Sequence, residues 1–242
     1  MARKGKLIAI EGTDGSGKGT QSRRLVRALR RDKVPVTLIS FPQYDRSFFG
    51  EAVAAYLRGE YGKAGAVDPH LAALLYAGDR FEARDRILRA IRSGRTVILD
   101  RYVRSNKAHQ AANLPAGARR GPFLDWIDRL EYGVFKLPRP DFTVTLHVPV
   151  RVAVELIGRK APRAHLRGNA RDLHEADLNH LRRAERVYLD LAKNTPPEKG
   201  ALIRCVTRNR LRQPEEITGA ILDALRERRL IPKRPGRGKV RG

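Results

Sequence analysis

Apolar runs alternate with amphipathic helical segments along the whole chain. Five runs rich in β-branched residues occupy 6–10 (KLIAI), 36–40 (VTLIS), 96–100 (TVILD), 142–148 (FTVTLHV) and 202–206 (LIRCV). At least one segment with helical periodicity separates each run from the next, which predicts parallel strands joined by helices. Continuous apolar character is typical of strands covered on both faces. The pattern therefore predicts an α/β fold, a three-layer α/β/α sandwich around a five-stranded parallel sheet.

The segment EGTDGSGKGTQ, residues 11–21, follows the first run directly. Its glycines permit a tight turn whose backbone N–H groups point at an anion, and Lys18 adds a positive charge. A strand before it and a helix after it form the context of a phosphate loop. The alternative is a glycine-rich turn that binds nothing. The pattern predicts contacts to ATP from Gly12, Thr13, Asp14, Gly15, Ser16, Gly17, Lys18, Gly19 and Thr20.

One position departs from the G-x-x-x-x-G-K-[ST] phosphate-loop pattern. Gly19 stands where a hydroxyl that binds Mg²⁺ is expected. Thr20 carries a hydroxyl one residue later, but a helix turns about 100° between neighbours, so its reach differs. Thr20 is therefore the candidate metal ligand within the loop.

Composition indicates the number of domains and the cellular compartment. A chain of 242 residues with 41% hydrophobic residues suits one domain with a core of its own. The single cysteine, Cys205, excludes an internal disulfide and a cysteine zinc cluster, so a reducing cytoplasm is the simplest compartment. No apolar run is long enough for a membrane span, and none follows the basic start as in a signal peptide. We expect a soluble, cytoplasmic protein without a membrane partner.

The net charge of +24 is compatible with nucleic acid or a small anionic substrate as partner, although diffuse arginine is more often a solvated surface. Arginine is spread along the chain, and neither a basic stripe with aromatic platforms nor a helix-turn-helix pattern is present, so no specific nucleic-acid site is expected. The Arg- and Gly-rich segment 158–172 lacks a core face and is interpreted as a mobile lid. Residues 232–242 are interpreted as a disordered basic tail, which leaves 1–231 as the folded domain.

Four segments, EGTDGSGKGTQ, FPQY, LLYAGDR and DRYVRSNKAHQ, in this order and spacing, resemble the thymidylate (dTMP) kinase family of P-loop nucleoside monophosphate kinases. The resemblance spans about residues 5–225. It implies a five-stranded parallel sheet with a lid, a homodimer, and phosphorylation of dTMP to dTDP by ATP and Mg²⁺. Adenylate kinases share GKGTQ but would not explain DRYVRSNKAHQ. Another nucleoside monophosphate or deoxynucleoside kinase, or a nucleic-acid-binding ATPase, stays an alternative.

Phosphoryl transfer between two phosphates needs positive charge more than a strong base, because the obstacle is repulsion between anions. Lys18 is the candidate for the β- and γ-phosphates of ATP, and Arg101, at the end of a predicted strand, for the acceptor phosphate. A surface ion pair is the alternative for Arg101. Asp100 is the candidate second metal ligand, acting through water, unless it only caps the next helix.

The lid is expected to supply further charge. By resemblance, relatives with Arg beside the loop aspartate place a catalytic charge there, whereas this chain has Gly15. Arg163 and Arg167 lie one helical turn apart in the lid and are the catalytic candidates. Arg159 is the candidate for stacking on the adenine of ATP.

The acceptor base is expected to lie against a helix that contains LLYAGDR. Tyr76 and Arg80 are four residues apart, so both project from one helix face. By resemblance, the tyrosine stacks on thymine and the arginine donates to a base carbonyl, while Phe41 of FPQY borders the same site. A tyrosine on a helix is otherwise often part of a core.

The sugar and the rest of the base are assigned by resemblance as well. Asp14 accepts a hydrogen bond from the 3′-hydroxyl, although an ordinary turn aspartate is the alternative. Ser105 and Gln110 border the base. His109 stands where the family usually has Tyr or Phe beside the deoxyribose. This departure leaves discrimination against ribose open.

Overall fold

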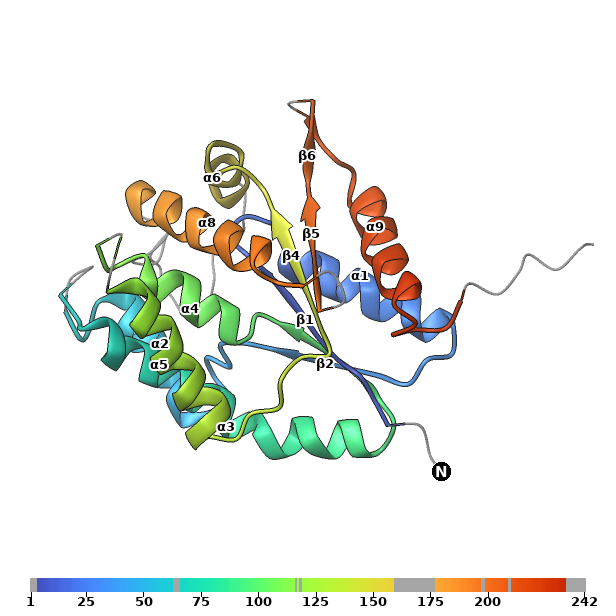
Figure 1. Ribbon diagram of the computed structural model, residues 1–242, viewed down its shortest axis with the longest axis horizontal. Helices are drawn as coiled ribbons and strands as arrows, with labels where there is room; N and C mark the ends of the chain where they lie inside the picture. The colour runs from blue at the N-terminus through green and yellow to red at the C-terminus, as the bar shows by residue number, and fades with distance from the viewer. Residues whose placement is uncertain are drawn as a thin grey trace, which may run out of the picture.

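The computed structural model describes residues 4–62, 66–115, 117, 119–158, 177–196, 199–208 and 210–233. Its centre is a parallel sheet of β1 (Leu7–Gly12), β2 (Val36–Ser40), β3 (Thr96–Asp100), β4 (Phe142–His147) and β5 (Gly200–Arg204). The strand order is β2-β3-β1-β4-β5 (Figure 1). The predicted five-stranded parallel sheet is confirmed.

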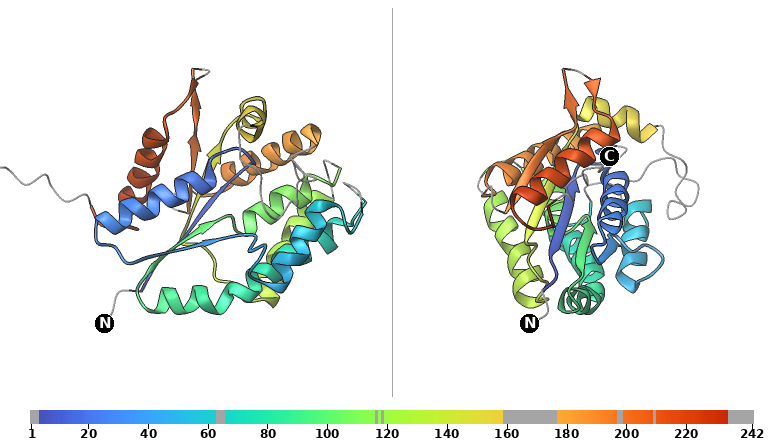
Figure 2. Two further views of the ribbon diagram at one scale, coloured as in Figure 1. Left: turned by 180° about the vertical axis from the view of Figure 1, so that it is seen from behind. Right: turned by 90° about the vertical axis from the view of Figure 1, so that its right-hand side faces the viewer.

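Helices cover both faces of the sheet (Figure 2). Their bounds are α1 (Lys18–Arg31), α2 (Phe48–Arg58), α3 (Pro69–Arg92), α4 (Val103–Ala111), α5 (Arg120–Asp128), α6 (Val150–Gly158), α8 (Leu178–Lys193) and α9 (Pro214–Glu227), with a π-helix, η1 (Arg129–Val134), directly after α5. Along β1, Ile8 and Ile10 pack with α1 and α9, whereas Leu7 and Ala9 pack with α3, α4, α5 and α8. Burial on both faces explains why the strands are apolar throughout.

The last predicted strand is the one that differs. The run LIRCV does not form one strand, because β5 ends at Arg204 and the chain continues into an antiparallel ribbon of β6 (Val206–Thr207) and β7 (Arg210–Leu211). Cys205 lies between them, buried, and its N–H donates to the carbonyl of His147 at 2.9 Å. Two-residue strands carry too little periodicity to be predicted from sequence.

Parts of the predicted organisation lie outside the described residues. Apart from Gly158, which ends α6, the predicted lid is among them, with Arg159, Arg163 and Arg167, and so is the tail from residue 234 onward.

Within the described part of the chain, no helix is long and apolar enough to cross a membrane.

Candidate active site

The phosphate loop joins β1 to α1 in a conformation that needs glycine. Gly12, Gly15 and Gly17 have positive φ angles of 141°, 78° and 84°, which residues with side chains rarely adopt. A Cβ on Gly12 would lie 2.3 Å from the carbonyl oxygen of Leu146, and one on Gly15 would lie 2.5 Å from that of Ala153. The loop therefore packs directly against β4 and α6, and position 15 has no room for an arginine.

Lys18 lies folded over this loop. Its side chain is buried, and its Nζ donates to the carbonyl oxygen of Thr13 at 2.6 Å and lies 3.5 Å from Ser16 Oγ. The hydroxyl of Thr13 is buried and has no hydrogen-bond partner among the described residues. An anion in the loop would replace the carbonyl oxygen as the partner of the ammonium group and would meet an unused hydroxyl.

The place of the missing hydroxyl faces Asp100. A Cβ on Gly19 would lie 3.2 Å from Asp100 Oδ2 and 3.5 Å from Arg23 Nη1. Asp100 is the last residue of β3, so the sheet delivers its carboxylate to the start of α1. Thr20 lies next to this place, exposed on the first turn of α1.

Arg101 follows β3 in a left-handed backbone conformation, with φ of 67°. Non-glycine residues with such angles are uncommon and collect at functional sites. Its N–H donates to the carbonyl of Ile10 at 3.0 Å, and its guanidinium donates to Asp14 Oδ1. Burial acts to lower the pKa of Arg101, but the attraction of Asp14 and other groups outweighs it, so the pKa lies well above its usual value. The guanidinium is a permanent cation beside the phosphate loop.

Glu11 holds the start of α4 in place from the end of β1. Its fully buried carboxylate accepts hydrogen bonds from the N–H groups of Tyr102, at 3.0 Å, and Ser105, at 3.2 Å, and from the Ser105 hydroxyl. Tyr188 donates to the same hydroxyl at 2.9 Å. Burial raises the pKa of Glu11. The Ser105 hydroxyl thus serves the framework, and the sequence carried no signal for Glu11, because its partners lie about ninety residues away.

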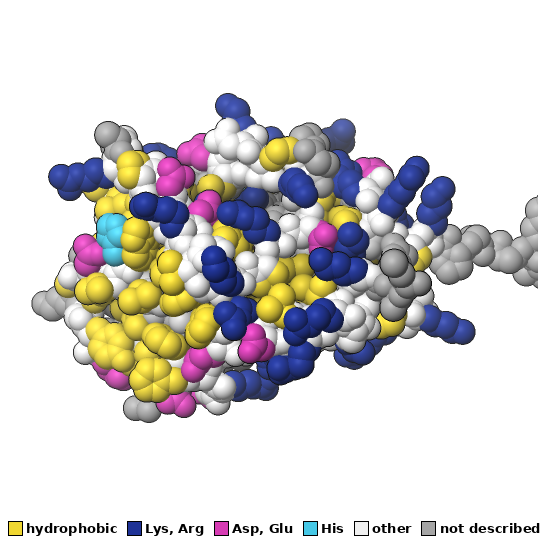
Figure 3. Space-filling model, turned by 60° about the horizontal axis from the view of Figure 1, so that its bottom comes forward, with side chains coloured by type: hydrophobic (Ala, Val, Ile, Leu, Met, Phe, Trp, Pro, Cys, Tyr) yellow, Lys and Arg dark blue, Asp and Glu magenta, His cyan; other side chains and the backbone are white. Residues whose placement is uncertain are grey.

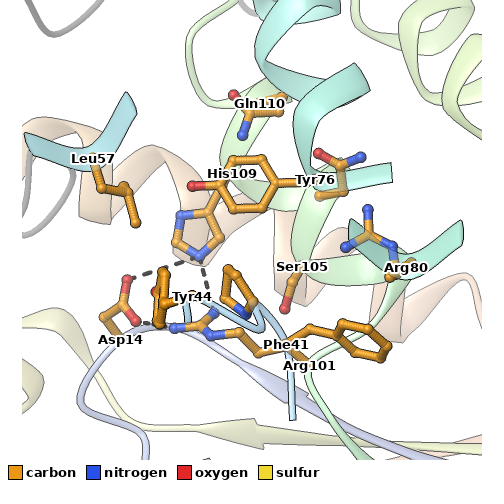
Figure 4. A pocket seen from close by; sticks show the side chains of 12 residues that line it. Asp14, Phe41, Tyr44, Leu57, Tyr76, Arg80, Arg101, Ser105, His109 and Gln110 are labelled. Carbon is orange, nitrogen blue, oxygen red and sulfur yellow. Dashed lines mark hydrogen bonds and ion pairs between the residues drawn. The ribbon is translucent and has the colours of Figure 1, made fainter. Parts of the chain in front are cut away.

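A cavity of about 530 Å³, partly open to solvent, adjoins the loop (Figure 4). It brings together all the predicted acceptor residues. Its lining comprises Asp14, Phe41, Pro42, Tyr44, Leu57, Tyr76, Arg80, Arg101, Ser105, Asn106, His109 and Gln110. Figure 4 shows Asp14, Arg101 and His109 toward one end and Arg80 toward the other.

The loop that contributes Phe41 and Tyr44 to this cavity is held by Asp79 of α3. The buried carboxylate of Asp79 accepts from the Gln43 N–H at 3.1 Å and from the Ser47 hydroxyl at 2.7 Å. Burial raises the pKa of Asp79. The same helix therefore fixes the loop through Asp79 and turns Tyr76 and Arg80 toward the cavity.

Arg80 is paired within the fold. Its Nε and Nη2 donate to the two carboxylate oxygens of Glu131 at 2.5 and 2.6 Å, and the side chains are 2% and 0% exposed. Burial acts to lower the pKa of Arg80, but Glu131 outweighs this and raises it. Asn106 Nδ2 donates to Glu131 Oε1 at 2.9 Å. Glu131 lies on the π-helix η1, a geometry frequent at functional sites.

This end of the cavity offers one unused donor and two unused acceptors. Arg80 Nη1 has no hydrogen-bond partner within the described part of the chain, and the buried Oδ1 of Asn106 and Oε1 of Gln110 have none there either. Asn106 and Glu131 were not predicted from the sequence. Asn106 adjoins Ser105 within the same segment, but nothing in the sequence marked Glu131, fifty-one residues from its partner.

Comparison with known proteins shows the family of this chain. The chain matches the family model for thymidylate kinase over residues 10–203. It belongs to the thymidylate kinase family. It is 39% identical to thymidylate kinase of Mycobacterium tuberculosis over 186 residues, which cover 77% of this chain and 85% of the relative.

The chain is also similar to thymidylate kinases of other organisms. The chain is 31% identical to that of Rhodopseudomonas palustris over 237 residues, with 96% of this chain and 94% of the relative covered. It is 33% identical to the human enzyme over 154 residues, with 64% and 66% covered. A solved structure of thymidylate kinase from Candida albicans has the same fold, with a TM-score of 0.72 at 23% identity and coverage of 95% and 96%. The chain is an ATP-dependent kinase that phosphorylates dTMP to dTDP.

Proposed function

We propose that the cavity is the dTMP site of this thymidylate kinase, with the nucleotide phosphate at Arg101, the sugar between Asp14 and His109, and the base at Arg80. The observation that carries this proposal is the position of Asp14, which belongs to the phosphate loop and also lines the cavity. The ion pair between Arg101 and Asp14 connects the two sites. An acceptor phosphate at Arg101 therefore lies next to the ATP phosphates that we assign to the loop and Lys18.

The unused polar atoms support a thymine or uracil base. These bases present a carbonyl acceptor, O4, beside an N–H donor, N3, which match a guanidinium donor and an amide acceptor. Cytosine presents an amino donor, N4, beside an unprotonated acceptor nitrogen, N3. The amino group would then meet the donor Arg80 Nη1, and N3 would meet the acceptor Asn106 Oδ1. Tyr76 supplies an aromatic face, and Phe41, Ser105 and Gln110 complete the wall.

The charges at the other end support the proposed catalytic roles. Lys18 and Arg101 offset repulsion between the donor and acceptor phosphates. Arg101 is paired with Asp14 in the structure, and an incoming phosphate takes over that guanidinium and leaves the carboxylate to accept from the 3′-hydroxyl. Arg163 and Arg167 of the lid add charge at the transferring group, and Arg159 stacks on the adenine.

The residues around Gly19 fit a magnesium ion that arrives with ATP. Mg²⁺ is commonly held by one or two carboxylates together with substrate phosphates and water. Asp100 supplies a carboxylate at the start of α1, next to Lys18, and Thr20 supplies a hydroxyl nearby. When bound, the ion neutralises charge on the β- and γ-phosphates of ATP. We assign Asp100, acting through water, and Thr20 to this role.

We also infer a homodimer and a cytoplasmic location. Exposed apolar side chains collect over α2, α3 and η1, and Figure 3 shows hydrophobic surface gathered on this side of the molecule. Its large members are Phe48, Leu71, Leu74, Phe81 and Val134. A contiguous patch of this kind is typical of a protein interface, and the family resemblance favours a second copy. Light scattering should give twice the mass of one chain, and Leu71→Asp should reduce the measured mass to that of a single chain.

The inference of a cytoplasmic location has a different basis. A single buried cysteine and nucleotide substrates favour the cytoplasm.

An assay of ADP release across several monophosphates tests the proposal. We expect the order dTMP, dUMP, UMP, with CMP, AMP and GMP near background. Since dUMP lacks one methyl group, it should lose about 1–3 kcal/mol of binding in the transition state. A small gap between dUMP and UMP would indicate that His109 leaves room for a ribose. Efficient phosphorylation of AMP would overturn the proposed base site.

A further inference from the structure

Two histidines connect the acceptor-phosphate arginine to α8. His109 Nε2 lies 3.5 Å from Arg101 Nη1, and His109 Nδ1 lies 3.4 Å from His180 Nε2. The other nitrogen of His180, Nδ1, lies 3.0 Å from Asn113 Oδ1. The imidazole planes differ by 24°, with ring centroids 5.7 Å apart, so the two rings meet edge to edge. Both are buried, with 8% and 2% exposed.

The chemistry at the two ends assigns the protons in this chain. Arg101 can only donate, so its 3.5 Å contact requires a lone pair on His109 Nε2, whereas Asp14 Oδ2, at 3.9 Å from the same nitrogen, lies beyond hydrogen-bond distance. The amide oxygen of Asn113 can only accept, so His180 Nδ1 must carry the proton. The remaining proton then lies on His109 Nδ1 and is donated to His180 Nε2. Neutral imidazoles protonated at Nδ1 satisfy all three contacts, and the opposite tautomer of either ring breaks two of them.

The geometry points to His109 and His180 as positioning residues that hold Arg101 in place for the acceptor phosphate. This inference rests on the proposed role of Arg101. The guanidinium has two holders in the structure, Asp14 at one terminal nitrogen and His109 at the other. Asp14 turns to the sugar when dTMP binds, whereas His109 keeps its contact because its own orientation is set from α8. His180 reaches the substrate only through His109.

Framework contacts keep this relay in register. His180 lies on the first turn of α8, where its N–H donates to the capping Asp177 at 3.0 Å. Tyr188, two turns further along α8, packs its ring edge against His109 at a centroid distance of 5.9 Å and an angle of 84°. The family resemblance expects a tyrosine or phenylalanine at position 109; phenylalanine has no lone pair, and the lone pairs of tyrosine lie on its hydroxyl and not on the ring, so neither reproduces the contact of the imidazole nitrogen with Arg101. The relay is a feature of this chain's own residues.

A double-mutant cycle separates the relay from simple packing. His180→Phe keeps an aromatic ring but removes both nitrogens, and we expect kcat/KM for dTMP to fall about 3- to 10-fold, the range of one buried hydrogen bond. The KM for ATP should not change. In a His109→Phe background the same substitution should have no further effect, because the relay is already broken. His147→Gln is the matched control, since His147 contacts α8 through Glu185 at 2.7 Å outside the relay.

Nitrogen-15 spectra of the histidines in the wild-type enzyme give a readout that folding defects do not affect. We expect both residues as neutral tautomers protonated at Nδ1 near pH 8. A tautomer protonated at Nε2 at either residue, or an equal effect of His180→Phe in both backgrounds, would overturn the relay. Arg101→Ala distinguishes the two levels of inference. If it leaves kcat/KM for dTMP unchanged, the proposed function of Arg101 fails, whereas a strong effect there with none from His180→Phe rejects the relay alone.

Discussion

The two ends of the acceptor cavity treat their arginines in opposite ways. At the base end, Arg80 is neutralised by Glu131, a partner from the fold itself, at 2.5 and 2.6 Å. At the phosphate end, Arg101 is paired with Asp14 and Lys18 with a carbonyl oxygen of its own loop, and the proposed function requires both partners to give way to phosphates. The fold itself therefore holds the base end, whereas we propose that the phosphate end exchanges its internal partners for substrate.

The contrast predicts that substitutions at the base end affect mainly the stability of the fold, whereas substitutions at the phosphate end affect mainly the rate of phosphoryl transfer. A buried ion pair that loses one partner leaves a charge without compensation inside the protein, so a substitution at the base end should damage the fold. Cations at the phosphate end act on charge that develops during transfer, so a substitution there should damage turnover and leave the fold intact. Variants at the two ends test whether the division holds.

The largest effect is expected at Glu131. Glu131→Ala leaves the guanidinium of Arg80 buried and unpaired, which should lower the free energy of unfolding by about 3–5 kcal/mol. Urea unfolding followed by circular dichroism measures this. The double variant Arg80→Met/Glu131→Leu is the control, because it removes both charges and should regain most of the stability while kcat/KM for dTMP stays low. If the single variant is as stable as the wild type, the base end is not built on this pair.

At the phosphate end, Lys18→Ala should lower kcat by about 10²- to 10³-fold, the effect of one preorganised donor on transition-state charge. The thermal midpoint should stay within a few degrees of the wild type, since the hydrogen bonds of Lys18 to Thr13 and Ser16 lie within the loop itself. Rates and melting curves on the same preparation check both statements. A variant that keeps more than a tenth of the wild-type rate would contradict the phosphate-loop assignment.

Sequence alone predicted the parts of this contrast that depend on local pattern. The strands, the phosphate loop and the shared face of Tyr76 and Arg80 follow from neighbours within a few residues, and the structure has them, except that the last predicted strand ends at Arg204. Glu131, Glu11 and His180 act across fifty to ninety residues, and such contacts depend on how helices pack over the sheet.

The periodicity of hydrophobic and polar residues in a single sequence does not show how helices pack over a sheet. The partners of Arg80 and Arg101 could therefore be found only in the fold. The short strands β6 and β7 were missed for a different reason, because two residues cannot show an alternation. The sequence therefore identified most of the side chains that line the cavity, although not Asn106, and the fold identified the partners that hold Arg80 and Arg101.

A smaller effect should come from the close approach of the loop to α6. Gly15→Arg must place a side chain at a φ of 78° and a Cβ 2.5 Å from the carbonyl oxygen of Ala153. The strain should lower the free energy of unfolding by about 1–3 kcal/mol. Neither Arg163→Ala nor Arg167→Ala should regain turnover when combined with it. A gain in the combined variants would show that the loop can carry the charge that we assign to the lid.

The smallest effect concerns the hydroxyl that the phosphate loop lacks. Gly19→Ser adds a Cβ 3.2 Å from Asp100 Oδ2, a tight contact that the carboxylate can relieve by a small rotation, and it adds a hydroxyl beside the proposed metal site. The rate at saturating Mg²⁺ should change less than about 3-fold. The added hydroxyl only replaces a water molecule as a ligand of the ion, and this exchange contributes roughly the strength of one hydrogen bond. The Mg²⁺ concentration for half-maximal rate should fall.

Two variants serve as controls. Gly19→Ala makes the same steric demand without the hydroxyl and should not lower the Mg²⁺ concentration for half-maximal rate, while Thr20→Ala should raise that concentration. If the serine and alanine variants respond to Mg²⁺ alike, the hydroxyl is not limiting, and if Thr20→Ala also leaves the response unchanged, Asp100 and water hold the ion without help from α1.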